Sequence, residues 1–278
     1  MDRTFFDAAT IRIKQTFIPE IDRNLPSWAR RTNPVVRRDL GAYWKTLTPD
    51  MMLVLRVYLI QVGLILVSFV FPVLFVLLMP TVTVTLVLLP VGLALYAQIL
   101  YGVGAAAATS VAKERRNTTL DLLLLIPHPT MHTLFSKVAA AVWRQTENLS
   151  LVLMGAATVS LPLLIIQYDV FISFADDPLL MRIGLALSLG MSIVRVLIEP
   201  VMIGALGVLA GAAIPSRIPA IVTTVGVGGA YFLLINLARL APLDTAGRLL
   251  VEIILPAVLP LLITALAFRA AAFLLTRD

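Results

Sequence analysis

The sequence predicts an all-α integral membrane fold with about six membrane-spanning helices. Composition is the first reason: 59% of the 278 residues are hydrophobic, 14% are charged, and the mean hydropathy is +0.95, whereas soluble domains are about 45–50% apolar and about 25% charged. The second reason is a series of apolar runs that reach the roughly 20 residues a spanning helix needs. Because the spans use most of the chain, we expect any ATPase or receptor domain to be a separate polypeptide.

Charge and motif content exclude several classes of function. The net charge is +6, but the basic residues flank apolar segments and form no single stripe, which indicates membrane topology and not nucleic-acid binding. The chain has no cysteine and no GxxxxGK[ST] phosphate-binding loop. We therefore expect no disulfide, no ATP hydrolysis by this chain, no catalytic residue and no cofactor of its own.

Residues 1–52 form a polar, amphipathic amino-terminal region. Asn33-Pro34 is a helix-start signal, with Asn33 as the cap and Pro34 at the first helical position. Apolar and aromatic residues then recur at helical spacing: Val36, Leu40, Tyr43, Trp44 and Leu47. This pattern predicts a helix lying in the membrane interface. The alternative is a solvated helix packed on protein.

Residues 53–278 form the predicted transmembrane domain. The spans are placed at 55–79, 82–111, 138–167, 180–213, 217–239 and 249–274. Pro80-Thr81 predicts a tight turn between the first two spans. The small residues at 102–108 and the GxxxG pair Gly207 and Gly211 predict close helix packing.

Lysine and arginine set the predicted orientation. The first 50 residues carry nine of them and 113–144 carries five, whereas the loop at 168–178 has only acids. The positive-inside rule then places both termini and the segment 113–137 in the cytoplasm. The loop that holds Arg239, Asp244 and Arg248 would be external.

The segment 113–137 combines charges, a short apolar helix and prolines between two spans. Thr118 or Thr119 can cap a helix, and Asp121 lies in its first turn, where the dipole favours an acid. Three leucines share one face and two prolines end the helix: Leu120, Leu123, Leu124, Pro127 and Pro129. About two turns of helix are unstable alone. We expect the bilayer surface or a groove on a partner to order them; the alternative is a plain amphipathic connector.

The same segment resembles a known family. Glu114, a basic residue, Thr119-Leu120-Asp121, Leu123-Leu124 and Pro127, followed by Ser136-Lys137, are similar to the pattern E-(K/R)-E-x-G-T-L-E-x-L-L-x-(S/T)-P then G-K of permease subunits of type-2 ABC transporters, the ATP-binding-cassette exporters. Residues 33–40 and the turn at 214–217 resemble the family as well. The chain departs from the pattern at Arg116, Thr118, Ile126 and Ser136.

The resemblance implies a coupling helix seated in a cleft of a separate cytoplasmic ATPase subunit. ATP and Mg would bind to that subunit, and a second permease subunit, identical or homologous, would complete the pathway in the plasma membrane of a prokaryote. The residues implied in coupling are Glu114, Thr119, Leu120, Asp121, Leu123, Leu124 and Pro127.

One pair of charges falls inside a predicted span. Arg195 and Glu199 are spaced i, i+4, and Pro200 follows them. A charge at the centre of a spanning helix is costly, so an ion pair is expected, and Pro200 predicts a break or kink. The pair is either a gate or polar patch on a transport path, or a structural ion pair inside the bundle.

Other functional classes remain as alternatives. An ATP-independent carrier or channel, an intramembrane enzyme and a membrane anchor that docks a partner without transport all fit an apolar chain. The enzyme would need converging acids or histidines, and the spans offer mainly Glu147 and Glu199. His128 and His132 have metal-ligand spacing, but Pro129 interrupts it and no third ligand converges, so no metal site is predicted.

Overall fold

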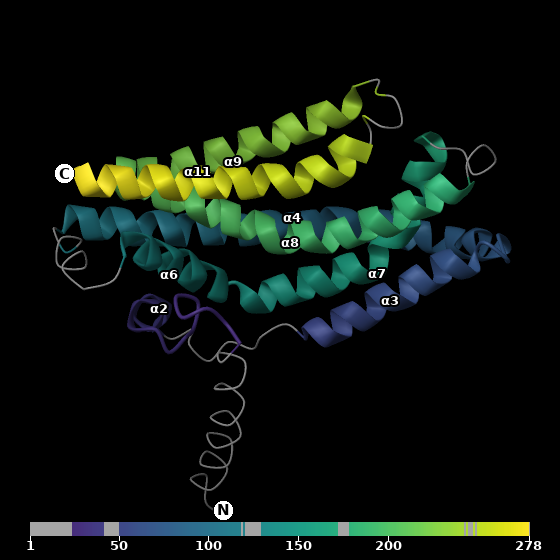
Figure 1. Ribbon diagram of the computed structural model, residues 1–278, viewed down its shortest axis with the longest axis horizontal. Helices are drawn as coiled ribbons and strands as arrows, with labels where there is room; N and C mark the ends of the chain where they lie inside the picture. Colours follow the sequence, from purple (N-terminus) through teal and green to yellow (C-terminus); the bar gives the residue numbers. More distant parts are fainter. Residues whose placement is uncertain are drawn as a thin grey trace, which may run out of the picture.

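The computed structural model describes residues 24–41, 50–117, 119, 129–171, 178–241, 243, 247 and 249–277 (Figure 1). Every regular element within these ranges is a helix, which confirms the all-α prediction for them. In chain order they are α2 Pro34–Leu40, α3 Met51–Val67, α4 Val73–Arg116, α6 Thr130–Trp143, α7 Thr146–Phe171, α8 Pro178–Ala213, α9 Arg217–Leu240, the π-helical turn η2 Leu250–Ile254, and α11 Leu255–Arg277.

Within the part of the chain that the structure describes, five helices are long and apolar enough to cross a membrane: α4, α7, α8, α9, and α11 together with η2. Large apolar side chains such as Ile60, Val70 and Val87 are 65%, 72% and 69% exposed, as expected of surfaces that lipid covers. The molecule is therefore a multi-pass, all-α membrane protein. The apolar helix α3 is shorter, with 17 residues, or about 26 Å at 1.5 Å per residue.

The long helices run back and forth between two ends of the molecule. At one end α4 finishes, α6 begins, α8 turns into α9 and the chain terminates, and α2 packs against α6 nearby (Figure 1). We call this the basic end, because the last turn of α4 carries Lys113, Arg115 and Arg116 and α9 starts at Arg217. The turns that follow α3, α7 and α9 lie at the opposite end.

The contact between α4 and α8 forms the centre of the bundle. α8 has the largest buried share of the five candidate spans. A Cβ atom at Gly207 would lie 2.7 Å from the Gly104 carbonyl oxygen, and one at Gly211 would lie 2.6 Å from the Ala108 carbonyl oxygen. Only glycine lets the two backbones approach this closely. The predicted packing role of the GxxxG pair is confirmed.

The predicted turn at Pro80-Thr81, between spans 55–79 and 82–111, is wrong. α4 runs uninterrupted through Pro80 and Pro90, and the chain turns instead at 68–72. Proline removes one backbone hydrogen bond from a helix, but apolar spans tolerate it where neighbouring groups compensate. Near Pro80 two hydroxyls also bond within the helix, that of Thr81 to the Leu78 carbonyl at 2.6 Å and that of Thr85 to the Thr81 carbonyl at 3.0 Å, although these are not the carbonyl that Pro80 leaves without its amide donor.

The predicted third span, 138–167, is also not one helix. α6 ends at Trp143 and α7 begins at Thr146, so the region has a break at 144–145 and starts earlier, after Pro129. Arg144 donates a hydrogen bond to the Asp39 carbonyl of α2, a contact that local sequence does not predict. By contrast, α8 and α9 begin and end within two residues of the predicted spans 180–213 and 217–239. The last predicted span, 249–274, comprises η2 and α11.

Candidate functional site

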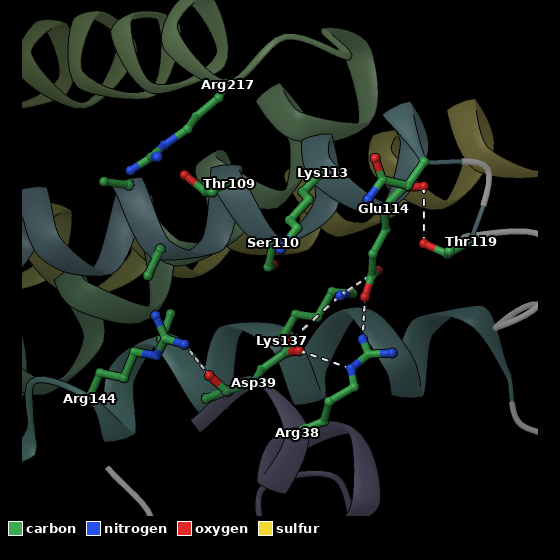
Figure 2. Close-up of a pocket in the computed structure, with 15 residues that line it drawn as sticks. Arg38, Asp39, Thr109, Ser110, Lys113, Glu114, Thr119, Lys137, Arg144 and Arg217 are labelled. Carbon is green, nitrogen blue, oxygen red and sulfur yellow. Dashed lines mark hydrogen bonds and ion pairs between the residues drawn. The ribbon is translucent and has the colours of Figure 1, made fainter. Parts of the chain in front are cut away.

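The basic end holds four charged side chains from three helices, which we call the junction cluster: Arg38 and Asp39 of α2, Glu114 of α4 and Lys137 of α6 (Figure 2). Lys137 Nζ lies 2.6 Å from Glu114 Oε2 and 3.5 Å from Asp39 Oδ2. The shorter contact lacks the angle of a hydrogen bond and is ionic. Arg38 donates to Glu114 Oε1, and its Nε donates to Asp39 Oδ1 at 3.3 Å. Two acids therefore balance two bases.

Lys137 is the central member of this cluster. It is 1% exposed, and its side chain is completely covered. A lysine is almost never fully buried unless it is paired, and removing one partner of a buried ion pair leaves an uncompensated charge. The pairing of Lys137 with acids from both α2 and α4 therefore holds the middle of α6 to these two helices.

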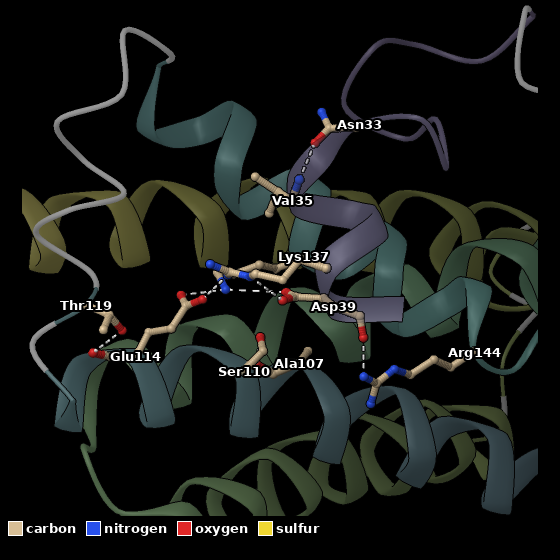
Figure 3. Close-up of polar contacts among 10 residues, drawn as sticks. Asn33, Val35, Asp39, Ala107, Ser110, Glu114, Thr119, Lys137 and Arg144 are labelled. Carbon is tan, nitrogen blue, oxygen red and sulfur yellow. Dashed lines mark hydrogen bonds and ion pairs between the residues drawn. The ribbon is translucent and has the colours of Figure 1, made fainter. Parts of the chain in front are cut away.

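Local sequence explains how α2 reaches the junction cluster. Asn33 Oδ1 accepts a hydrogen bond from the Val35 amide at 2.9 Å, and Pro34 occupies the first turn, as the cap signal predicts. Val36 and Leu40 are buried against Ala140 of α6. α2 is thus fixed with Asp39 facing Lys137 (Figure 3). The predicted amphipathic positions Tyr43, Trp44 and Leu47 lie outside the described residues.

The structure describes two of the residues implied in coupling to an ATPase. Glu114 is 9% exposed and points into the junction cluster, so its contacts are internal. Thr119 is exposed, and its amide and hydroxyl lie 3.1 and 3.4 Å from the Glu114 carbonyl oxygen. The others, Leu120, Asp121, Leu123, Leu124 and Pro127, lie outside the described residues.

A second cluster lies within the spans and joins α4, α8 and α9. Arg195 Nε and Nη2 each lie 2.9 Å from Glu199 Oε1. The hydroxyl of Tyr96 donates to Glu199 Oε2 at 2.7 Å, and that of Tyr231 donates to Oε1 at 3.3 Å. Glu199 is 1% exposed, so a buried carboxylate has one cation and two hydroxyls around it. We call these four residues the intramembrane cluster.

Pro200 does not break α8. α8 continues through Pro200 as one helix, so the break that the proline predicts is absent. The Arg195 side chain is 21% exposed while that of Glu199 is 1% exposed. The cation therefore reaches the edge of the bundle, and the carboxylate stays inside it.

Sequence reasoning missed several members of both clusters. Tyr96 and Tyr231 lie 103 and 32 positions from Glu199, and a tyrosine in an apolar run carries no sign of its partner. Asp39 and Lys137 are 98 positions apart. The available signal was a lysine at the start of an apolar segment, which requires an acid nearby if the segment is buried.

Among the described residues no group of three His, Asp or Glu side chains is placed to hold a metal ion. His132 lies on α6, and its Nε2 is 3.1 Å from the Ser27 hydroxyl. His128 lies outside the described residues. The side chains brought together at both clusters therefore offer charge pairing and hydrogen bonding.

The fold and these clusters define a multi-pass, all-α membrane protein with buried ion pairs both at one end and within its spans. No family model, curated protein or solved structure matches this chain.

Proposed function

We propose that the chain is the membrane-spanning permease subunit of an ATP-binding-cassette exporter. In this proposal α3 is a sixth span, both termini and the basic end face the cytoplasm, and α2 lies along the membrane interface. A separate ATPase subunit binds ATP and Mg, and a second permease subunit, identical or homologous, completes the pathway in the plasma membrane of a prokaryote.

One observation carries the proposal: Glu114 lies in the last turn of α4, before the segment that resembles a coupling helix, and it pairs with Lys137 of α6, the helix that follows the segment. α2 joins the same cluster through Asp39. A force applied to the segment would therefore act on α2, α4 and α6 together. Binding of ATP can drive such a switch only through different affinities for the two states of the complex.

The first experiment targets the apolar face of the segment. Replacing Leu120 and Leu123 by Asp places charges where a partner groove would be apolar, so we expect a co-purifying ATPase to be lost while the spans remain inserted. Replacing both leucines by Met, which conserves volume, is the matched control and keeps the ATPase. Stoichiometric ATPase on the Asp variant would refute the docking assignment.

The orientation is tested separately, because the chain has no cysteine of its own. A cysteine at exposed position 119 provides the single labelling site. We expect a membrane-impermeant maleimide to label it in inside-out vesicles and not in intact cells. Labelling from outside alone would place the segment on the wrong face and end the ABC proposal.

The intramembrane cluster supports a second candidate, an ATP-independent carrier. Ionisable side chains within spans mark ion or substrate pathways in many transporters, and Glu199 is buried between two tyrosines and Arg195. Transport in proteoliposomes separates the candidates. An ATPase-dependent exporter needs the partner subunit and ATP, whereas a carrier works without them and responds to an imposed ion gradient.

A further inference from the structure

A cavity of about 660 Å³ lies at the basic end beside the junction cluster, lined mainly by α4 and α6 (Figure 2). The cavity is open because one face of α4 carries small side chains there: Ala105, Ala106, Thr109 and Ser110. Ala140 and Ala141 of α6 also line it. Along α4 the cavity extends from Ala105 to Lys113, about 12 Å at 1.5 Å per residue.

The charge of the lining is unbalanced. Five basic side chains line it, Arg38, Lys113, Lys137, Arg144 and Arg217, against two acidic ones, Asp39 and Glu114. Both acids already contact Arg38 and Lys137. Lys113 and Arg217 make no ion pair with any residue that the structure describes. The cavity is therefore lined by two cations without an acidic partner among the described residues, by hydroxyl groups and by alanine side chains.

We propose that this cavity binds the phosphate-bearing headgroup of an anionic lipid, with Lys113 and Arg217 contacting the phosphate. Charged donors form short, strong hydrogen bonds to phosphate oxygens, and basic pockets between spans at the cytoplasmic side suit anionic headgroups. Thr109 and Ser110 add hydroxyl donors deeper along α4.

The wall of the cavity favours a lipid over an acidic side chain of a partner protein. Four alanines form part of the lining, Ala105 and Ala106 of α4 and Ala140 and Ala141 of α6, and their apolar surface suits the hydrocarbon next to a headgroup and not a hydrated carboxylate. The site does not depend on export by ATP, because an exporter subunit, a carrier and an anchor would all expose it to the same leaflet.

Binding is measured on the purified full-length chain in neutral detergent, with fluorescent short-chain phosphatidylglycerol as the probe and the matching phosphatidylcholine as the neutral reference. The test variant is Lys113→Gln with Arg217→Gln. The control is Arg37→Gln with Arg56→Gln, which removes two exposed cations that do not line the cavity. Lys113→Arg with Arg217→Lys keeps both charges and checks that the site folds.

We expect wild type to bind phosphatidylglycerol at least about tenfold more tightly than phosphatidylcholine. Each cation lost from the cavity should weaken binding about fivefold, or about 25-fold for both. The control and the charge-keeping variant should bind like wild type. Equal binding of both lipids, unchanged binding by the test variant, or an equal loss in the control would overturn the proposal.

A competition arm identifies the source of the phosphate. If inorganic phosphate at millimolar concentration binds alone and displaces the probe completely, the site takes soluble phosphate and the lipid assignment is wrong. If the chain binds no phosphatidylglycerol but retains an acidic protein that the test variant loses, the cavity is a protein-docking site and the proposal also fails.

Discussion

The junction cluster and the intramembrane cluster each bury a glutamate, but they hold it in different ways. Glu114 is paired with Arg38 and Lys137, which come from two other helices. Glu199 is paired with Arg195 four residues away on its own helix, and the hydrogen bonds that it accepts from other helices come from the tyrosine hydroxyls of Tyr96 and Tyr231. The cations that neutralise Glu114 come from other helices, whereas the cation that neutralises Glu199 comes from the same helix.

This difference determines what each cluster can stabilise. The contacts of Glu114 with Arg38 and Lys137, and that of Lys137 with Asp39, form only when α2, α4 and α6 are together, so their energy counts toward the association of these helices. The Arg195–Glu199 pair can form in an isolated helix that crosses the bilayer, so much of its energy is present before the helices pack. The hydrogen bonds from the Tyr96 and Tyr231 hydroxyls are added when the helices associate.

Among the variants considered, replacement of Lys137 should cause the largest loss of unfolding free energy. Lys137→Met keeps the unbranched apolar part of the side chain but removes the ammonium group, which leaves Glu114 and Asp39 without their shared buried cation. Breaking a buried ion pair from one side costs about 3–5 kcal/mol, so we expect a loss of unfolding free energy of that size. The measurement is unfolding of the purified chain in mixed micelles, followed by loss of helical circular dichroism.

A double variant shows whether the loss is electrostatic. Lys137→Met with Glu114→Gln removes one charge of each sign, and we expect it to recover more than half of the stability lost by Lys137→Met alone. Additive losses would mean that the two residues stabilise the fold independently, and that Glu114 has no special relation to Lys137.

Local signals predicted the helices better than their connections. An apolar run of about 20 residues is a signal carried by the segment itself, which is why the predicted limits of α8 and α9 agree with the structure. Pro80 misled the prediction because the effect of a proline depends on its surroundings, and a single span tolerates it. The break at 144–145 accompanies a hydrogen bond from Arg144 to α2, which no local pattern contains.

The same reasoning applies to the two clusters. Arg195 and Glu199 could be paired from their spacing because they share one helix. Lys137 and Asp39 could not be paired, because their 98-residue separation is bridged only once α2 packs on α6. The sequence therefore predicted the ion pair within one helix, Arg195 with Glu199, and missed the contact between helices, Lys137 with Asp39.

Disturbing the packing between α4 and α8 should cause a loss of unfolding free energy of intermediate size. Gly207→Ala places a Cβ atom 2.7 Å from the Gly104 carbonyl oxygen, and overpacking of this kind costs about 1–3 kcal/mol. Gly226→Ala is the matched control, since nothing lies within 4 Å of its Cβ position; we expect it to be neutral or slightly stabilising. Both are measured by unfolding in mixed micelles.

This pair of variants also sharpens the comparison of the clusters. Tyr96 lies on α4 and Glu199 on α8, so separating the two helices should lengthen their 2.7 Å hydrogen bond. In the Gly207→Ala background, Tyr96→Phe should therefore lower the unfolding free energy by less than it does in wild type. Lys137→Met should lower it by the same amount in both backgrounds. An unchanged cost of Tyr96→Phe would show that the close glycine contact does not position the intramembrane cluster.

The smallest expected effect is the coupling between Arg195 and Glu199. Glu199→Gln alone should lower the unfolding free energy, because it leaves Arg195 without its carboxylate, and Arg195→Gln in the same chain should restore part of the loss. Both residues lie on α8, so much of their interaction is already present before the helices pack. We therefore expect a coupling energy of about 1 kcal/mol, near the low end of the range for residues in contact. A four-variant unfolding cycle measures it. A coupling as large as that between Lys137 and Glu114 would mean that the pair forms only in the packed bundle, and the contrast between the clusters would be lost.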